Sequence, residues 1–116
     1  MEEQQFPVTP LNAGFAVAPQ LVPEAMAAVA AAGFRAVVNN RPDFEGGPDQ
    51  PTSAAIEAAA VAAGLEYRYL PVNGAYQSPE EIAAMRALVD ALPRPVLAFC
   101  RSGARSTKLY TAACAL

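Results

Sequence analysis

The segment from residue 100 to residue 106 combines a nucleophile with the features of an anion-binding loop. It reads Cys-Arg-Ser-Gly-Ala-Arg-Ser, and it follows the continuous apolar run 96–99, which is typical of a buried strand. A helix is expected from Arg105 onward, so the loop N–H groups and the positive end of the helix would converge on the sulfur of Cys100. Both effects favour a thiolate, and we expect the pKa of Cys100 to lie below that of free cysteine.

The other side chains of this loop suit a bound oxyanion. Arg105 can donate to two oxygens at once, and Gly103 allows a tight turn without a Cβ. Ser106 can cap the helix or donate its hydroxyl proton to the sulfur. Alternatively, Cys100 is only a small buried residue that ends a strand. We assign Cys100 and Arg105 as catalytic. The residues predicted to bind the substrate are Arg101, Ser102, Gly103, Ala104, Ser106 and Arg41.

A second loop, residues 40–51, is rich in Pro, Gly and Asp and contains the sequence Arg-Pro-Asp. Its Asp43 is predicted to be catalytic, as the general acid; alternatively it holds Arg41 or Arg105 in place. Glu45 is a weaker candidate for the same site. The competing interpretation is an ordinary turn with an Asx interaction.

The rest of the chain alternates short apolar runs with helical patterns. The strands are expected at 15–18, 34–39, 65–70 and 96–99, and the helices at 23–33, 52–63, 78–92 and from 105 onward. This alternation predicts an α/β fold with a mostly parallel central sheet of four to five strands flanked by helices. Ligands bind beyond the carboxyl ends of such strands, where both loops would lie. We expect residues 1–12 to form a loosely held tail and residues 13–116 to form a single domain.

Composition limits the partners. The chain has 116 residues, of which 53% are hydrophobic and 16% charged, so it can bury a core. Its net charge is -3 and its pI is about 4.8, which argues against nucleic acid or an anionic membrane surface as a partner. The locally basic segment around Arg101, Arg105 and Lys108 instead favours a small anion.

Cysteine and histidine usage limits the compartment and the chemistry. We find no secretory signal and no apolar run long enough to span a bilayer, and the two cysteines do not suggest a disulfide framework; we therefore expect a cytoplasmic protein. Cys114 is expected to be a core residue. The chain has no histidine, which excludes Ser-His-Asp and Cys-His catalysis and every histidine-based metal site. We expect neither a metal nor another cofactor.

The Cys100 loop resembles the active-site loops of two related enzyme classes, the protein tyrosine and dual-specificity phosphatases and the rhodanese sulfurtransferases. The phosphatase motif has five residues between Cys and Arg, whereas this chain has four, because only Ala104 separates Gly103 from Arg105. The shorter form resembles the single-domain rhodaneses. Phe99 also stands where the phosphatases usually place a histidine, so one support for a low thiol pKa is lost.

The order of motifs narrows this resemblance. Residues 39–43 (Asn-Asn-Arg-Pro-Asp), the helix before Gly64, residues 70–72 (Leu-Pro-Val) and the Cys100 loop together resemble the phosphatase-like domain of beta-lactamase-hydrolase-like proteins. The resemblance covers roughly residues 10–116. Members of this group are described both as phosphatase-like and as sulfurtransferases. Some are fused to a metallo-beta-lactamase-type persulfide dioxygenase, which the resemblance therefore implies as a partner.

Three functions follow as hypotheses. The first is a sulfurtransferase, in which Cys100 takes a sulfane sulfur from a small anionic donor and holds it as a persulfide; its leaving group needs no general acid. The second is a phosphatase that acts on a phosphate ester through a phosphocysteine, which requires a larger cradle and a proton donor. The third is a non-catalytic anion-binding module. The shortened loop favours the first.

Overall fold

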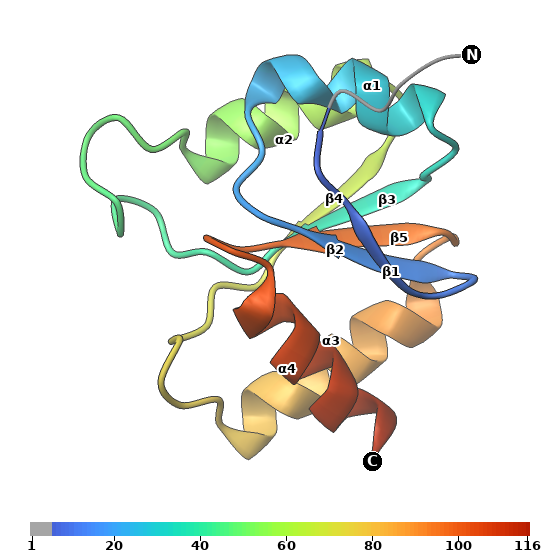
Figure 1. Ribbon diagram of the computed structural model, residues 1–116, viewed down its shortest axis with the longest axis vertical. Helices are drawn as coiled ribbons and strands as arrows, with labels where there is room; N and C mark the ends of the chain where they lie inside the picture. The colour runs from blue at the N-terminus through green and yellow to red at the C-terminus, as the bar shows by residue number, and fades with distance from the viewer. Residues whose placement is uncertain (1–5) are drawn as a thin grey trace.

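A five-stranded sheet forms the centre of the computed structural model, which describes residues 6–116 (Figure 1). The strand order is β1-β2-β5-β3-β4, and only the β1–β2 pair is antiparallel. The strands are β1 (Thr9–Asn12), β2 (Phe15–Ala18), β3 (Ala36–Asn39), β4 (Glu66–Tyr69) and β5 (Val96–Phe99). The predicted α/β fold with a mostly parallel sheet of four to five strands is therefore confirmed.

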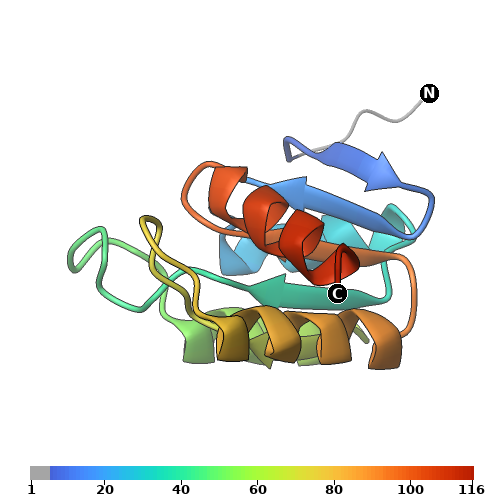
Figure 2. The ribbon, with the colours of Figure 1, turned by 90° about the horizontal axis from the view of Figure 1, so that it is seen from below.

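Helices cover both faces of the sheet. The short 3₁₀ turn η1 (Pro23–Ala25), α1 (Met26–Ala31) and α2 (Ser53–Ala62) lie on one face, and α3 (Pro79–Ala91) and α4 (Ala104–Cys114) lie on the other (Figures 1 and 2). Side chains of β5 alternate between these layers: Leu97 and Phe99 pack toward α1 and α2, whereas Val96 and Ala98 pack toward α3 and α4. β5 is thus buried on both sides, as its continuous apolar sequence predicts.

The helix boundaries follow local capping signals. Ser78 accepts a hydrogen bond from the N–H of Glu81, whose carboxylate accepts one from the Ser78 N–H, so the predicted capping box at the start of α3 is present. The Thr52 hydroxyl accepts from the N–H of Ala55 and starts α2. α4 begins at Ala104, one residue earlier than expected. In the described part of the chain, no helix has the length and apolarity needed to cross a membrane.

The N-terminal segment differs from the prediction. Residues 1–12 were expected to be a loose tail, but Thr9–Asn12 form β1 and pair with β2 at the edge of the sheet. Phe6 is also buried, against the α1–α2 side of the core. Residues 1–5 of the predicted tail lie outside the described residues. The folded domain therefore begins before residue 13.

Candidate active site

The register of the parallel strands brings three chain segments to one edge of the sheet. Phe99 of β5 is level with Ala18 of β2 on one side and with Asn39 of β3 on the other. The residues that follow these positions stay connected: the Cys100 N–H donates to the Ala18 carbonyl at 3.4 Å, and the Asn40 N–H donates to the Phe99 carbonyl at 2.8 Å. The two loops predicted to carry the site therefore meet at the carboxyl ends of the strands.

Cys100 lies at the centre of this edge in a ring of hydrogen-bond donors. The N–H of Gly103 lies 3.0 Å from its sulfur. Burial raises the pKa of the thiol, but the N–H and hydroxyl of Ser106 and the N–H groups of Ser102 and Gly103 outweigh burial, so the pKa lies below the ordinary value. Gly103 has a φ of 95°, a left-handed conformation that a side chain would strain. The expected thiolate cradle is present without a histidine before the cysteine.

Arg105 points one edge of its guanidinium into the site. The guanidinium has five N–H groups. The two on NH1 donate to a carboxylate oxygen of Glu45 and to the carbonyl of Val72, and one on NH2 donates to the second carboxylate oxygen of Glu45. The Nε–H has no partner among the described residues, although Nε is buried. Nε and the remaining N–H of NH2 lie on the same edge, which matches two oxygens of an oxyanion. A buried unpartnered donor of this kind indicates a binding site for an acceptor group.

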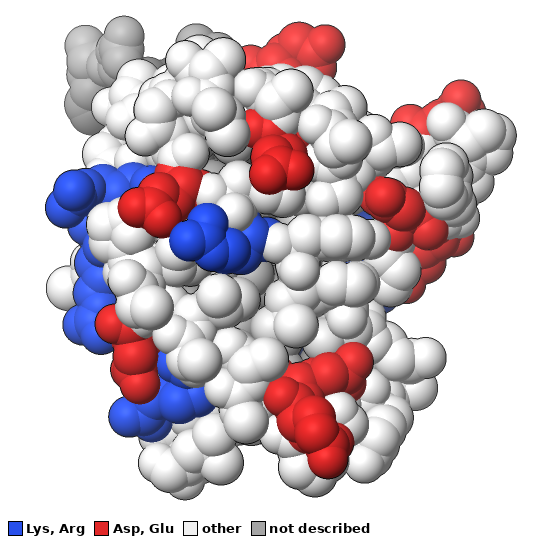
Figure 3. All heavy atoms as spheres, turned by 180° about the vertical axis from the view of Figure 1, so that it is seen from behind, with Lys and Arg blue, Asp and Glu red and all other residues white. Residues whose placement is uncertain are grey.

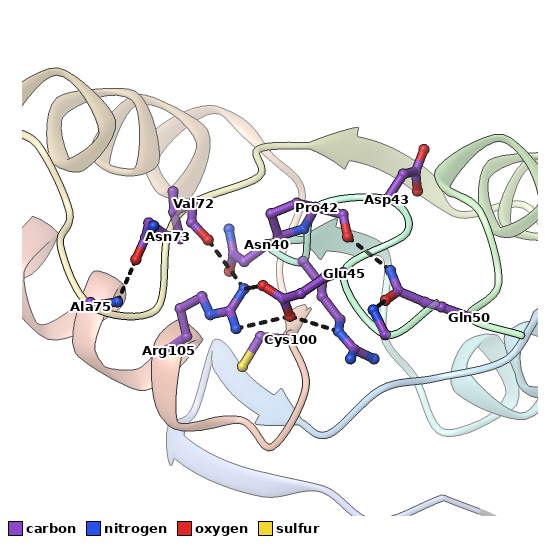
Figure 4. A network of polar contacts seen from close by, with 12 residues as sticks. Asn40, Pro42, Asp43, Glu45, Gln50, Val72, Asn73, Ala75, Cys100 and Arg105 are labelled. Carbon is purple, nitrogen blue, oxygen red and sulfur yellow. Dashed lines mark hydrogen bonds and ion pairs between the residues drawn. The ribbon is translucent and has the colours of Figure 1, made fainter. Parts of the chain in front are cut away.

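Glu45 holds this arrangement together. Its carboxylate accepts from NH1 and NH2 of Arg105 at 3.0 and 3.1 Å (Figure 4). It also accepts from Nε of Arg41 at 2.9 Å, so it links the two arginines. The hydrogen bonds from Arg105 are the main reason why the pKa of Glu45 is lowered; burial opposes them, and Arg41 adds to them. Arg41 is itself buried and donates to Gln20 at 3.2 Å. Arg41 thus acts on the site through Glu45.

The structure does not bring Asp43 to the site, so its prediction as the general acid is not supported. Its carboxylate points away from Cys100 (Figure 4) and accepts from the N–H of Ser53, at the start of α2, at 2.7 Å. Its own N–H donates to the hydroxyl of Tyr69. Asp43 therefore anchors the 40–51 loop to α2 and β4. Glu45, the weaker candidate from the sequence, is the carboxylate that contacts Arg105.

Asn40 is a site residue that sequence reasoning missed. It is fully buried; its side-chain oxygen accepts from the Ser106 hydroxyl at 2.8 Å, and its amide nitrogen donates to the Leu70 carbonyl at 2.9 Å. It thereby connects the loop after β3, the end of β4 and the start of α4. The only signal for it in the sequence is a polar residue directly after a buried strand. Ser106 lies beside Cys100 as predicted, and its hydroxyl is shared between the side-chain oxygen of Asn40 and the sulfur of Cys100.

A cavity of about 310 Å³ opens above the sulfur. Its lining contains the predicted residues Arg101, Ser102, Ala104 and Arg105 together with Cys100, and it adds Gly74 and Lys108. Gly103 does not line the cavity but forms the turn behind it. Arg41, which was predicted to bind the substrate, does not line it either and contacts Glu45 instead. Cys114 is exposed near the far end of α4, which differs from the core position expected for it. No group of three His, Cys, Asp or Glu side chains within residues 6–116 could hold a metal ion.

A low-pKa cysteine between a central parallel strand and a helix, with an arginine in the first turn of that helix, is the arrangement of the cysteine phosphatases. The comparison with known families agrees with this class. Residues 8–116 match the family described as "Beta-lactamase hydrolase-like protein, phosphatase-like domain", and the chain belongs to it. The resemblance stated from the sequence is therefore confirmed.

Known proteins similar to this chain include beta-lactamase hydrolase-like proteins, by sequence, and phosphatases, by structure. A beta-lactamase hydrolase-like protein from Agrobacterium fabrum is 37% identical over 82 residues, 71% of this chain, but the match covers only 19% of that relative's length. Among solved structures, a candidate phosphatase from Neisseria meningitidis Z2491 is 29% identical with a TM-score of 0.81, covering 88% of this chain and 72% of that one. Tk-PTP, 19% identical with a TM-score of 0.70 and coverages of 91% and 69%, shows the same fold. These similarities support a phosphatase-like cysteine enzyme.

Proposed function

We propose that the chain is a sulfurtransferase that carries a sulfane sulfur on Cys100. The Cys100 thiolate attacks the outer sulfur of a donor such as thiosulfate; a new S–S bond forms, the old S–S bond breaks, and sulfite leaves with the electron pair. The charges balance without proton transfer, because a thiolate and a thiosulfate dianion give a persulfide anion and a sulfite dianion. Two oxygens of the departing sulfite group match the free edge of Arg105.

The observation that carries this proposal is the state of the nearby carboxylates. Phosphate ester hydrolysis through cysteine needs an acid to protonate the leaving oxygen. Asp43 faces α2, and Glu45 is bound to two arginines that lower its pKa, so it stays ionised near neutral pH. The segment 70–77, which forms the neighbouring loop, contains no carboxylate. A reaction whose leaving group departs as a stable anion fits this environment.

The second candidate is a phosphatase that works through a phosphocysteine. The comparisons favour it over sulfur transfer, because solved structures similar to this chain include proteins named as phosphatases, one of them at 29% identity. The free edge of Arg105 fits a phosphoryl group as well as a sulfonate group. Substrates with acidic leaving groups, such as aryl phosphates, would need the least help from a proton donor.

Intact-mass measurement separates the candidates. After incubation with thiosulfate and removal of excess donor, we expect a gain of one sulfur on the wild-type chain and none on Cys100→Ser. Cys114→Ser is the matched control and should gain the sulfur normally. Steady hydrolysis of an aryl phosphate that depends on Cys100, without a sulfur adduct, would replace the proposal with the phosphatase. Oxyanion binding without adduct or turnover would leave a binding module.

A further inference from the structure

The cavity above Cys100 is larger than the group that reacts there. Its volume is about 310 Å³. A sulfonate group on the free edge of Arg105 would fill only part of it. The remaining space extends past Cys100 to Arg101 and Lys108, which also line the cavity. The site therefore has room for an organic molecule attached to the reacting sulfur.

The outer part of the cavity is positively charged and uncompensated. Arg41 and Arg105 are both paired with Glu45. Arg101 and Lys108, by contrast, are exposed and form no salt bridge within residues 6–116. Two free cations at the mouth of a cavity attract an anionic group that is separate from the one at the cysteine.

Access to the sulfur sets the shape of this molecule. Cys100 is only 1% exposed, so an acceptor must bring its own sulfur down into the cavity. A thiol at the end of a slender aliphatic chain can do so, whereas a thiol embedded in a folded protein surface cannot without local unfolding. The exposed cations then lie where the other end of such a chain would emerge.

We propose that the sulfur acceptor is a low-molecular-weight thiol that bears a carboxylate, held by Arg101 and Lys108. This inference rests on the proposed sulfur transfer. The acceptor thiolate attacks the outer sulfur of the Cys100 persulfide; the S–S bond to Cys100 breaks, and Cys100 leaves as a thiolate. The product is the persulfide of the acceptor, and no external oxidant or reductant is consumed.

Single-turnover transfer tests the proposal with defined probes. The chain is loaded with thiosulfate, freed of excess donor and checked by intact mass, and the loss of the added sulfur is timed after mixing with 3-mercaptopropionate, 2-mercaptoethanol or cysteamine. These thiols carry a negative, no and a positive charge, and rates are expressed per thiolate. We expect the carboxylate thiol to react about tenfold faster than the neutral one, roughly threefold for each cation, and the amine to react slowest.

Two charge-removing variants and one control locate the effect. Arg101→Gln and Lys108→Gln should each reduce the preference for the carboxylate thiol over 2-mercaptoethanol about threefold, and the double variant should abolish it. Arg94→Gln removes an exposed arginine before β5, at the other end of the sheet, and should leave the preference unchanged. Figure 3 shows the molecule from behind, with Lys and Arg side chains gathered along one side of this face. Raising the salt concentration should weaken the preference in the wild type.

The outcomes separate this inference from the function on which it rests. If Cys100 never gains sulfur, the proposed function fails and the acceptor proposal fails with it. If the persulfide forms but reacts equally fast with all three thiols, only the acceptor proposal is overturned. The same holds if the preference survives in the double variant, because the cations would then not be its cause.

Discussion

Replacement of Glu45 by glutamine tests the central contact of the site. The carboxylate accepts three charge-assisted hydrogen bonds, from Arg41 and Arg105, and the side chains of Glu45, Arg41 and Arg105 are 30%, 10% and 12% exposed. Glutamine keeps one acceptor oxygen and loses the charge, so two mostly buried arginines lose their anion. Such a loss costs about 3 kcal/mol when fully buried, and the partial exposure of Glu45 reduces our expectation to about 2 kcal/mol. For 116 residues this corresponds to a fall in melting temperature of about 8 °C.

The pH dependence of this difference provides a sharper assay. The folded-state pKa of Glu45 is lowered from 4.5, so its contribution to stability is fully present above the unfolded-state pKa and disappears as the pH falls through the folded-state value. Urea unfolding of the wild type and Glu45→Gln should therefore show a constant difference in the free energy of unfolding near neutral pH. The difference should shrink below about pH 4.5. Glu57→Gln, an exposed carboxylate on α2 without a salt bridge among the described residues, is the matched control.

Two results would refute this reasoning. One is a melting temperature of Glu45→Gln within about 2 °C of both the wild type and Glu57→Gln, far less than the 8 °C expected. The other is a difference in unfolding free energy that persists unchanged into acid, which would show that packing, not the ionised carboxylate, is responsible. The rate of persulfide formation should also fall in Glu45→Gln, since Arg105 is no longer held.

Three further variants probe the same site. Ser106→Ala should raise the pKa of Cys100, seen as a shift to higher pH in the rate of thiol alkylation, because it removes a donor that favours the thiolate; an unchanged profile would contradict that role. Gly74→Ala would place a Cβ 3.3 Å from NH2 and 3.4 Å from Nε of Arg105, so thiosulfate should load Cys100 at least several-fold more slowly while the melting temperature changes little. Asp43→Ala should lower stability by about 1 kcal/mol, because the N–H of Ser53 at the start of α2 loses its acceptor, and should leave the thiosulfate loading rate within about twofold of wild type; a large loss of that rate would show that Asp43 supports the site.

Most strands and the helices that cover the sheet could be predicted, because the sequence patterns that indicate them are local. The apolar run 96–99 and the capping box at Ser78 each depend on residues adjacent in the sequence, and both are found where expected. β1 was missed because Thr-Pro-Leu-Asn has a proline and no clear alternation. Its strand conformation depends on pairing with β2, and proline is tolerated there because β1 lies at the sheet edge.

The site was predicted as far as it lies on one segment. Cys100, Arg105 and the loop between them could be found because strand, loop and helix follow one another directly. Which of Asp43 and Glu45 would face the site could not be predicted. That choice depends on Phe44, which has a φ of 66° although it is not a glycine. This left-handed residue reverses the direction of the chain between the two carboxylates, and nothing in the residue type indicates it.

The cradle around the sulfur has a consequence for engineering. Its N–H donors belong to the main chain, while the side chains of Arg101, Ser102 and Ala104 are exposed on the cavity side of the same loop. Those three positions, with Lys108, can therefore be randomised together without removing a donor from the nucleophile. A library built on them would change which molecules enter while the reactive centre is kept, so this small domain is a natural starting scaffold for selecting new cysteine-dependent enzymes.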